Sequence, residues 1–296
     1  PEELAEKVYE FLEVVTPSID YPVRKLSEVE AEYEDFVIVL AFAVCNPQMI
    51  ERIRTLGEQY QLYVPDVPVV GGGLFTPEFC EEHEEEIQTV YQSLADERSR
   101  QIYANIINFK ISGNPAYLID QVDSKDEIWN RVIQPTTHEI YVDLGAYNGD
   151  TIREMLEYTR GKYHRIIAVE PDKRNFRRLC VGTHNERAVF CVNALLADEN
   201  GDSYVEAAKG RGAHESETGA PIPKITVDSL FADTGVDFMK FDVEGAELAA
   251  LRGAVRVIKK YRPAMLVSCY HRSEDLFTLP LEILSVRSDY KLYLRH

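Results

Sequence analysis

The stretch 139–155, EIYVDLGAYNGDTIREM, combines acidic residues and two glycines in a spacing that could hold a nucleoside. Ile140 to Leu144 is apolar except for Asp143, which is typical of a strand buried on both faces of a parallel sheet. Gly145 and Gly149 then bracket a short loop, and a helix with one apolar face is predicted after it. Glycine lets the backbone approach a ligand, and the free N–H groups that open a helix favour negative charge. The order strand, glycine loop, helix therefore predicts a nucleotide-type site.

The loop sequence GAYNGD argues against a dinucleotide as the ligand. A dinucleotide fingerprint, G-x-G-x-x-G, needs its second glycine to admit a pyrophosphate. Tyr147 occupies that position, and Asp150 would repel a pyrophosphate. Asp143 and Asp150 instead suit a cationic ligand that carries a ribose and an amino group, and S-adenosylmethionine is such a ligand. The residues expected to bind this cofactor are Asp143, Gly145, Ala146, Tyr147, Gly149, Asp150, Thr151, Glu170, Pro171, Asn193, Ala194 and Asp242.

Glu170 and Asn193 each end a predicted strand further along the chain. Glu170 comes about 20 residues after the loop, which is the offset expected for a carboxylate that accepts the ribose hydroxyls. The alternative for Glu170 is an acid that starts a turn with Pro171, and we expect the ribose role. Asn193 would lie beside the adenine, where its amide could bond the ring edge, or it could form a turn. Both roles stay open for Asn193.

Lys240, Asp242, Glu244 and Glu247 form the densest charged group in the chain, and Glu247 suits the first turn of the following helix. In a strand over 236–243 the side chains of Lys240, Asp242 and Glu244 would share one side. Burying a lysine beside two acids is costly unless the charges pair or take part in chemistry, so a structural ion-pair network is the alternative to catalysis. We expect catalysis, because the charges lie at the ligand end of the strand. The residues expected to be catalytic are His271, Asp242, Glu244 and Lys240.

His271 follows a predicted strand at 264–270 and is the candidate for a general base. A general base must lie beside the group whose proton it removes, such as a hydroxyl, and the ordinary histidine pKa of about 6.5 suits that task. Asp242 and Glu244 could orient His271, or Asp242 could itself be the base. A divalent metal held by these three residues could instead lower the hydroxyl pKa. Because no compact ligand motif is present and Lys240 offsets part of the negative charge, we expect no metal.

The strands and helices that must position these residues alternate after residue 138. Strands are expected at 140–144, 165–170, 188–195, 236–243, 264–270 and 290–294, and helices at 172–181 and 246–261. Such alternation predicts an α/β fold with a mainly parallel sheet covered by helices and with ligands at the carboxyl ends of the strands. The Gly/Ala-rich residues 210–220 are expected to form a surface loop.

The first part of the chain shows a second, smaller α/β pattern. A helix is expected at 2–15, a strand at 36–44, a helix at 47–60 and a strand at 61–70, followed by a helix at 77–108. The middle three elements would form a βαβ-like unit. The glycine run at 71–73 is interpreted as a turn, because no Lys-Ser/Thr follows it as a phosphate loop would require.

Three ordered motifs carry a resemblance to a known family. The segments DLGAYNGDT at 143–151, IIAVEPD at 166–172 and FMKFDVEGAE at 238–247 resemble the FkbM-type S-adenosylmethionine-dependent methyltransferases. The resemblance covers the chain from about Glu139 to its C-terminus. It implies a Rossmann-like class I methyltransferase sheet of seven strands with helices on both faces. It also implies an enzyme that O-methylates a small hydroxylated acceptor, sugar-like or polyketide-like.

Composition limits the partners and the compartment. The 296 residues carry a formal net charge of −18, so neither nucleic acid nor a membrane surface is expected as a partner. The longest apolar run, at 36–44, is far shorter than the roughly 20 residues of a membrane helix. Five cysteines without C-x-x-C spacing are expected to be reduced thiols in a cytoplasmic protein. Because the sequence opens on Pro1 rather than on methionine, we expect it to be part of a longer chain.

The length favours two domains. We expect an N-terminal α/β accessory domain at 1–112, a linker with an adapter helix at 113–137 and the methyltransferase domain at 138–296. The accessory domain could bind part of the acceptor or form a homo-oligomer interface, and the sequence leaves both open. Two other functions also stay open: a protein that binds the nucleoside without catalysis, and an NAD-linked oxidoreductase, which the missing middle glycine disfavours.

Overall fold

The computed structural model describes residues 24–42, 46–71, 73–207, 213–216, 219–231 and 234–296. Contacts divide the chain into two compact units, one made of Pro1–Pro65 with Asn114–Ala116 and one made of Asp66–Gly113 with Tyr117–His296. This division differs from the expected boundaries after residues 112 and 137, because residues 66–113 contact the later part of the chain. No helix among the described residues has the length and apolar character needed to cross a membrane.

The smaller unit contains a short βαβ motif. Its elements are α2 (Leu26–Glu32), β1 (Val37–Val39), α3 (Pro47–Gln59) and β2 (Gln61–Tyr63). Asn46 caps α3 by accepting a hydrogen bond from the backbone N–H of Gln48 at 2.8 Å, and β1 pairs with β2 in parallel. The expected strand, helix and strand are therefore present, with shorter strands. The helix expected at 2–15 and Cys45 lie outside the described residues.

The larger unit is built on a five-stranded parallel sheet. Its strands are β3 (Ile140–Leu144), β4 (Arg165–Val169), β5 (Val189–Val192), β10 (Phe238–Phe241) and β11 (Ala264–Val267). They lie in the order β11-β10-β3-β4-β5, and every pair is parallel. The chain moves outward from β3 to β5 and then returns to the other side of β3, so the order reverses between β3 and β10. Ligands of such sheets bind at the carboxyl ends of the strands at this point.

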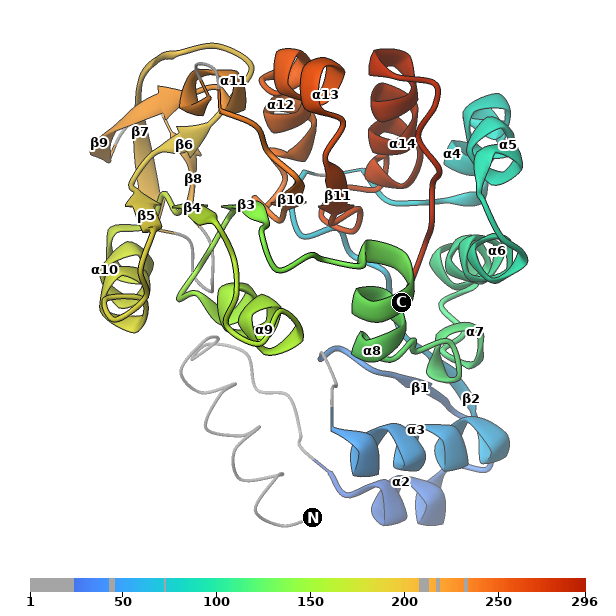
Figure 1. Ribbon diagram of the computed structural model, residues 1–296. Coiled ribbons are helices and arrows are strands. Elements are labelled where there is room, and N and C mark those ends of the chain that lie inside the picture. Colours follow the sequence, from blue (N-terminus) through green and yellow to red (C-terminus); the bar gives the residue numbers. More distant parts are fainter. Residues whose placement is uncertain (1–23, 43–45, 72, 208–212, 217–218, 232–233) are drawn as a thin grey trace. The chain divides into compact units, whose positions relative to one another are not determined.

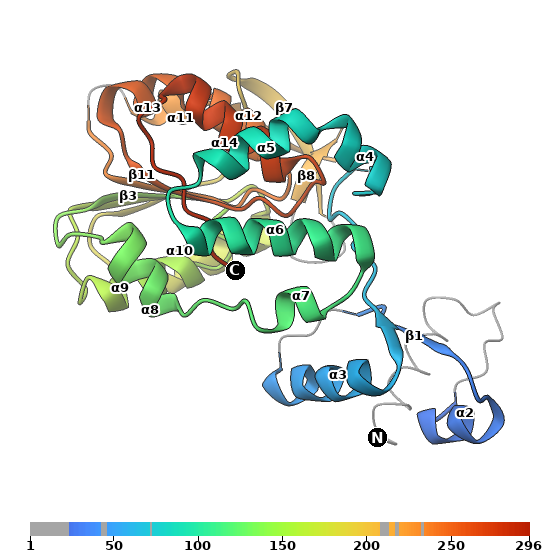
Figure 2. The same ribbon diagram turned by 90° about the vertical axis from the view of Figure 1, so that its right-hand side faces the viewer.

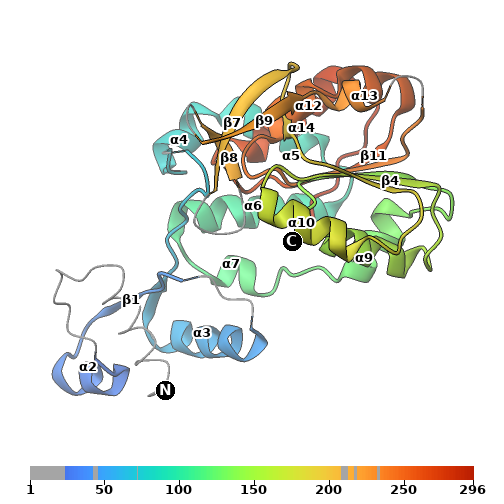
Figure 3. The same ribbon diagram turned by 90° about the vertical axis from the view of Figure 1, so that its left-hand side faces the viewer.

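Helices cover both faces of this sheet, as the three ribbon views show (Figures 1, 2 and 3). On one face lie α12 (Glu247–Arg252), α13 (Val255–Tyr261) and α14 (Asp275–Val286), and on the other lie α9 (Asp150–Tyr158) and α10 (Lys173–Gly182). Alternate strand residues supply the two cores: Val142 and Met239 pack toward the first face, and Tyr141 and Phe238 toward the second. The α/β fold with a doubly covered parallel sheet is confirmed.

The expected seven strands are not confirmed, since the parallel sheet has five strands among the described residues. After β5 the chain enters a separate sheet made of β6 (Leu195–Leu196), β7 (Gly201–Ala207), β8 (Ala213–Ser216) and β9 (Ala220–Ile225), in the order β6-β9-β7-β8. The loop expected at 210–220 thus overlaps two strands, because backbone pairing and a small core of Leu195, Val205 and Ile222 outweigh weak local preferences. The strand expected at 290–294 is reduced to one parallel bridge between Leu94 and Leu292.

Two expected helices are interrupted. The helix at 77–108 is divided into α4 (Pro77–Glu82), α5 (Glu84–Ser93) and α6 (Glu97–Ser112), with Asp96 capping α6 by accepting from Ser99 N at 2.8 Å. The helix at 246–261 is divided at Gly253, where a Cβ atom would lie 2.1 Å from the carbonyl oxygen of Ala197. The remaining short elements are α7 (Ala116–Ile119), α8 (Lys125–Glu127), the π-helical turn η1 (Ile128–Ile133) and α11 (Val227–Leu230).

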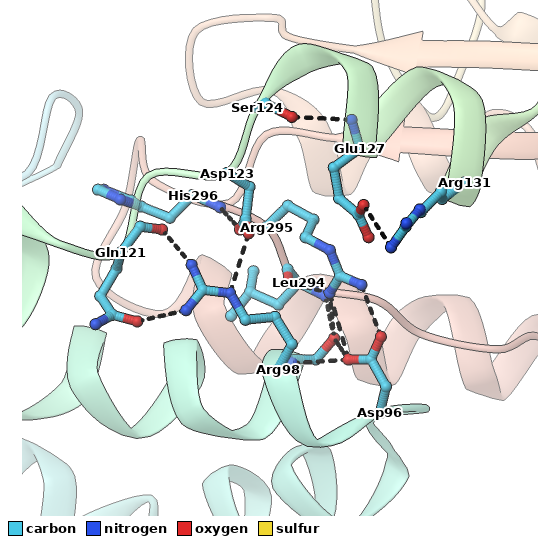
Figure 4. A network of polar contacts seen from close by, with 11 residues as sticks. Asp96, Arg98, Gln121, Asp123, Ser124, Glu127, Arg131, Leu294, Arg295 and His296 are labelled. Carbon is cyan, nitrogen blue, oxygen red and sulfur yellow. Dashed lines mark hydrogen bonds and ion pairs between the residues drawn. The ribbon is translucent and has the colours of Figure 1, made fainter.

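A polar network joins α6 to the C-terminal residues of the larger unit (Figure 4). Arg295 Nη2 donates to Asp96 Oδ2 at 2.6 Å, and Arg98 Nε donates to Asp123 Oδ1 at 3.0 Å. The backbone N–H of His296 donates to the other oxygen of Asp123 at 3.1 Å. Because these contacts link residues 96–98, 123 and 295–296, residues 66–113 are part of the same unit as the main sheet.

Candidate active site

The loop between β3 and α9 has the expected strand, glycine loop, helix form. Gly145 has φ +83°, and a Cβ atom there would lie 1.8 Å from the carbonyl oxygen of Asp242, so no other residue fits against the end of β10. The backbone N–H groups of Gly145 and Ala146 both donate to the carbonyl oxygen of Val169, at 3.0 and 2.9 Å. The loop is thus held between the ends of β4 and β10, the two strands that flank β3, at the point where the strand order reverses.

The rest of this loop leads into α9. Tyr147 has φ +47° and Gly149 has φ +80°, and α9 begins at Asp150. Asp150 is exposed, and its Oδ1 accepts a hydrogen bond from the backbone N–H of Thr151 at 2.9 Å. These predicted cofactor residues therefore lie at one edge of the sheet, as expected from their sequence order.

Glu170 follows β4 directly and joins two segments of backbone. Its Oε2 accepts from Tyr147 N at 2.8 Å, and its Oε1 accepts from Asp172 N at 2.9 Å. The side chain is buried, and burial raises the pKa of Glu170 to about 7 although both backbone hydrogen bonds oppose the rise. Glu170 therefore starts a turn, which was the alternative considered from the sequence, and the same carboxylate also binds the glycine loop.

Asn193 follows β5 and supports that turn. Its Nδ2 donates to the carbonyl oxygens of Glu170 and Pro171, at 2.8 and 2.9 Å. Both N–H groups of the amide can therefore serve the turn, which leaves Oδ1 as the atom that could accept from the amino group of an adenine. Ala194, the next residue, is fully buried.

Lys240 lies buried between two acids at the ends of β3 and β10. Its Nζ is 3.3 Å from Asp143 Oδ1, 3.4 Å from Asp242 Oδ2 and 3.4 Å from the carbonyl oxygen of Gly145. Burial alone would lower the pKa of Lys240, but Asp143 and Asp242 raise it above its ordinary value. Burial raises the pKa of Asp143, and Lys240 opposes that rise. The ion-pair network considered from the sequence is therefore present, and it fixes Asp242 at the edge of the sheet.

His271 follows β11 and is surrounded by carboxylates. Its Nε2 lies 3.7 Å from Asp242 Oδ1 and 3.7 Å from Glu244 Oε2, and its Nδ1 lies 3.0 Å from Glu247 Oε1. Burial would lower the pKa of His271, but Glu247, Asp242 and Glu244 together raise it. The Tyr270 ring packs beside His271 with centroids 4.2 Å apart, and its hydroxyl donates to Asp242 Oδ1 at 3.2 Å. The structure thus brings all four expected catalytic residues to one edge.

A role at the site was not expected from the sequence for Tyr270 or for the segment 66–75, and Glu247 was expected only as an acid in the charged group and in the first turn of its helix. The backbone N–H of Val70 donates to the carbonyl oxygen of His271 at 2.9 Å, and Ser273 Oγ donates to that of Gly73 at 2.6 Å. The glycine run was the available signal, since a close backbone approach can require glycine as well as a turn. Residues expected in an accessory domain therefore support the loop that carries His271.

Three side chains at this edge could each offer one atom to a metal ion. These atoms, from Asp242, Glu247 and His271, lie within 4.8 Å of one another, whereas the sequence suggested Glu244 in place of Glu247. Both oxygens of Glu247 already accept backbone hydrogen bonds, from Val243 N at 2.8 Å and from Gly245 N at 3.0 Å. In this arrangement Glu247 holds the loop and contacts the histidine. Metal-free chemistry stays a prediction.

Comparison with known proteins decides the family. A family model described as the methyltransferase FkbM domain matches residues 143–290, half of the chain. The chain belongs to the FkbM methyltransferase family. All the expected site residues of this FkbM-family chain fall inside the matched region.

Solved structures extend the likeness beyond the matched region. A crystal structure of methyltransferase FkbM from Methylobacillus flagellatus is 23% identical with a TM-score of 0.71, covering 91% of this chain and 72% of that one. At this identity the likeness concerns the fold, and it supports a class I methyltransferase fold. Aeropyrum pernix fibrillarin with natively bound S-adenosyl-L-methionine is 14% identical over 52% of this chain and 59% of that one, at a TM-score of 0.31. No curated protein sequence matches the chain.

Proposed function

We propose that this FkbM-family chain transfers a methyl group from S-adenosylmethionine to a hydroxyl oxygen of a sugar or related small metabolite. Family membership supports methyl transfer. The observation that carries the finer proposal is the arrangement of two polar groups on either side of the strand-order reversal. Glu170 and the glycine loop lie at the ends of β3 and β4, and His271 with its carboxylates lies beyond β10 and β11.

The residues of the first group fit the adenosyl part of the cofactor. Glu170 accepts one backbone N–H on each oxygen, and a carboxylate has about four acceptor positions, so both oxygens can also accept from ribose hydroxyls. Asn193 Oδ1 suits the adenine amino group. Asp143, Asp242 and Asp150 outnumber Lys240 at this edge, which favours a ligand with positive charge. When bound, S-adenosylmethionine supplies an activated methyl group on a positively charged sulfur.

The residues of the second group fit the removal of a hydroxyl proton. His271 Nε2 has no hydrogen bond to a described residue, and it faces the partly exposed Asp242 and Glu244. We assign it the role of general base, which typically contributes about 10²–10⁴-fold. Asp242 and Glu244 stabilise the imidazolium that forms when the proton is taken. Lys240 keeps Asp242 in place from the buried side.

The acceptor is proposed from the family resemblance to be sugar-like or polyketide-like. A cytoplasmic location is also proposed, and the described cysteines Cys80, Cys180, Cys191 and Cys269 support it because all four are free thiols. The N-terminal unit is proposed to bind part of the acceptor or a second copy of the chain.

A transfer assay tests the proposal. The chain is incubated with S-adenosylmethionine carrying a labelled methyl group and a panel of monosaccharides, nucleotide sugars and polyketide alcohols. We expect label on a hydroxyl oxygen of one acceptor class, and a loss of about 10²–10⁴-fold in kcat for His271→Gln. Glu274→Gln is the matched control, since Glu274 lies three residues further on and is not among the carboxylates that pair with His271.

Two outcomes would overturn the proposal. Tight binding of S-adenosylhomocysteine with no label on any acceptor would favour a protein that binds the nucleoside without catalysis. Binding of reduced nicotinamide dinucleotide with no response to S-adenosylhomocysteine would favour an oxidoreductase. Full activity of His271→Gln would remove the base assignment while leaving methyl transfer intact.

A further inference from the structure

We propose that Glu247 is a positioning residue for His271, which holds Nδ1 so that the free electron pair of Nε2 meets the acceptor hydroxyl. This inference rests on the proposed function for its catalytic meaning, while its structural content concerns the chain alone. Glu247 is the first residue of α12 and lies 24 residues before the histidine, so no local sequence pattern links the two.

Glu247 is fully buried, and its carboxylate is fixed from two directions. Oε1 accepts from Val243 N at 2.8 Å, and Oε2 accepts from Gly245 N at 3.0 Å. A buried carboxylate is costly unless hydrogen bonds and a partner with positive character compensate it. The two backbone bonds supply part of that compensation and remove the freedom of the side chain to rotate. The position of Oε1 relative to His271 is therefore set by the loop at the end of β10.

The contact at Nδ1 decides which nitrogen of His271 carries the proton. A neutral imidazole has one N–H donor and one acceptor nitrogen, and the hydrogen bond at one nitrogen selects the form. Glu247 Oε1 lies 3.0 Å from Nδ1, at an angle outside the range of a hydrogen bond. Two unprotonated acceptors this close would repel each other, so Nδ1 holds the proton. Nε2 is then the acceptor. Its neighbours Asp242 Oδ1 and Glu244 Oε2 are both 3.7 Å away, too far to occupy it by a hydrogen bond.

The surroundings of the ring make the carboxylate contact effective. His271 is only 1% exposed, and burial would by itself favour the neutral ring. The groups that face it are Glu247 from α12, Asp242 and Glu244 after β10, the Tyr270 ring, and Asp275 at the start of α14. The carboxylates outweigh burial and raise the pKa of His271, with Glu247 the largest contributor among them. Removal of Glu247 should therefore lower the pKa of His271 and remove the preference for the neutral form protonated at Nδ1.

Nuclear magnetic resonance of ¹⁵N-labelled histidine tests this without an acceptor. Long-range ¹H–¹⁵N spectra report the tautomer and the pKa of each ring, and the spectrum of His271→Gln assigns the signal. In the unaltered chain we expect protonation at Nδ1 in the neutral ring and a pKa above the ordinary 6.5. In Glu247→Gln we expect a lower pKa and a mixture of tautomers, whereas Glu274→Gln should leave both unchanged. A ring protonated at Nε2, or an unchanged pKa in Glu247→Gln, would overturn the proposal.

A second variant covers the case in which the amide disturbs the fold. An amide can accept only one of the two backbone hydrogen bonds that Glu247 accepts, so urea unfolding is measured alongside. Glu247→Asp keeps the charge but withdraws it by one methylene, and we expect the same loss of tautomer preference in a folded chain. A folded Glu247→Asp with the Nδ1-protonated form intact would also contradict the proposal.

Kinetics provide a readout that a merely structural role would not move. If Glu247 acts through His271, the double variant Glu247→Gln/His271→Gln loses no more kcat than His271→Gln alone, because residues that act as a unit are non-additive. Glu247→Gln alone should lose about tenfold or more, with its pH profile shifted to lower pH. Additive losses would assign Glu247 a role in loop stability only. Since the spectra need no acceptor, failure of the transfer assay and failure of this inference are distinguishable.

Discussion

Gly145→Ala tests whether the loop after β3 must lie directly against the end of β10. Gly145 has φ +83°, and an added Cβ atom would lie 1.8 Å from Asp242 O and 2.7 Å from Asp242 C. Cβ atoms essentially never approach closer than 3.0 Å, so the two strand ends would have to separate by about 1.2 Å. The same movement would displace Asp242 from Lys240 and from His271.

The expected loss of stability has two parts. A non-glycine residue in the left-handed region costs about 1–2 kcal/mol, and forced overpacking typically costs about 1–3 kcal/mol. The sum of about 2–5 kcal/mol is a large share of the roughly 5–15 kcal/mol that stabilises a typical domain. A displacement of about 1 Å at the site would also reduce turnover by about 10²-fold.

Gly161→Ala is the matched control for the first part. Gly161 has φ +69°, and nothing lies within 4 Å of the position of an added Cβ atom. Urea unfolding of both variants gives the cost of the backbone conformation from Gly161→Ala and the cost of the collision from the difference. We expect Gly145→Ala to be at least about 1 kcal/mol less stable than Gly161→Ala. Equal stabilities, with S-adenosylhomocysteine binding retained, would refute the close packing of the two strand ends.

Three further predictions concern charge and packing at the site. Because burial raises the pKa of Glu170 to about 7, the carboxyl becomes neutral as the pH falls below about 7. The affinity for S-adenosylhomocysteine should then drop by up to about tenfold per pH unit. Calorimetry measures this pH profile, which should be flat for Glu170→Gln. Lys240→Met leaves the fully buried Asp143 without its cation. It should lower the free energy of unfolding, measured in urea, by about 3–5 kcal/mol. Adding Asp143→Asn to the same chain should restore most of that stability. Gly245→Ala places a Cβ atom 3.0 Å from Val70 Cβ, so the thermal midpoint of this variant should fall. Adding Val70→Ala to the same chain should recover part of the loss in thermal midpoint. No recovery would contradict the contact.

The strand ends could be predicted because parallel sheets place successive carboxyl ends at one edge. The expected strand at 140–144 coincides with β3, since an apolar run bounded by a glycine loop leaves little freedom in its limits. Glu170 and His271 were placed for the same reason: Glu170 directly follows the largely buried strand β4, His271 follows β11 after three further residues, and parallel strands bring both to the same edge. The positions of these residues follow from local pattern and topology together.

Other features depend on contacts that no local pattern contains. The contact between Glu247 and His271 joins a helix start to a distant strand end, and in the sequence Glu247 looked only like a favourable first-turn acid. Lys240 was expected to be catalytic, but its two ion pairs with buried or partly buried acids also give it a structural role. The separate sheet β6-β9-β7-β8 arises from long-range pairing of short strands, one of which contains two prolines, where β propensity is weak.

The grouping of residues 66–113 with the main sheet could not be predicted from the sequence either. Composition and the glycine and proline positions near residue 113 suggested a domain boundary there. The ion pairs of Arg295 with Asp96 and of Arg98 with Asp123, together with the hydrogen bond from Val70 to His271, outweigh that local signal. Domain boundaries fall where few contacts cross, and these partly buried contacts join residues on both sides of residue 113.

Calorimetric titration with S-adenosylhomocysteine tests the central claim most directly, that the edge formed by the glycine loop and Glu170 binds an adenosyl thioether. We expect saturable binding of one molecule per chain, weakened at least about tenfold by Glu170→Ala, and no heat from reduced nicotinamide dinucleotide. No binding of S-adenosylhomocysteine to the folded chain, or equal affinity in Glu170→Ala, would contradict the account.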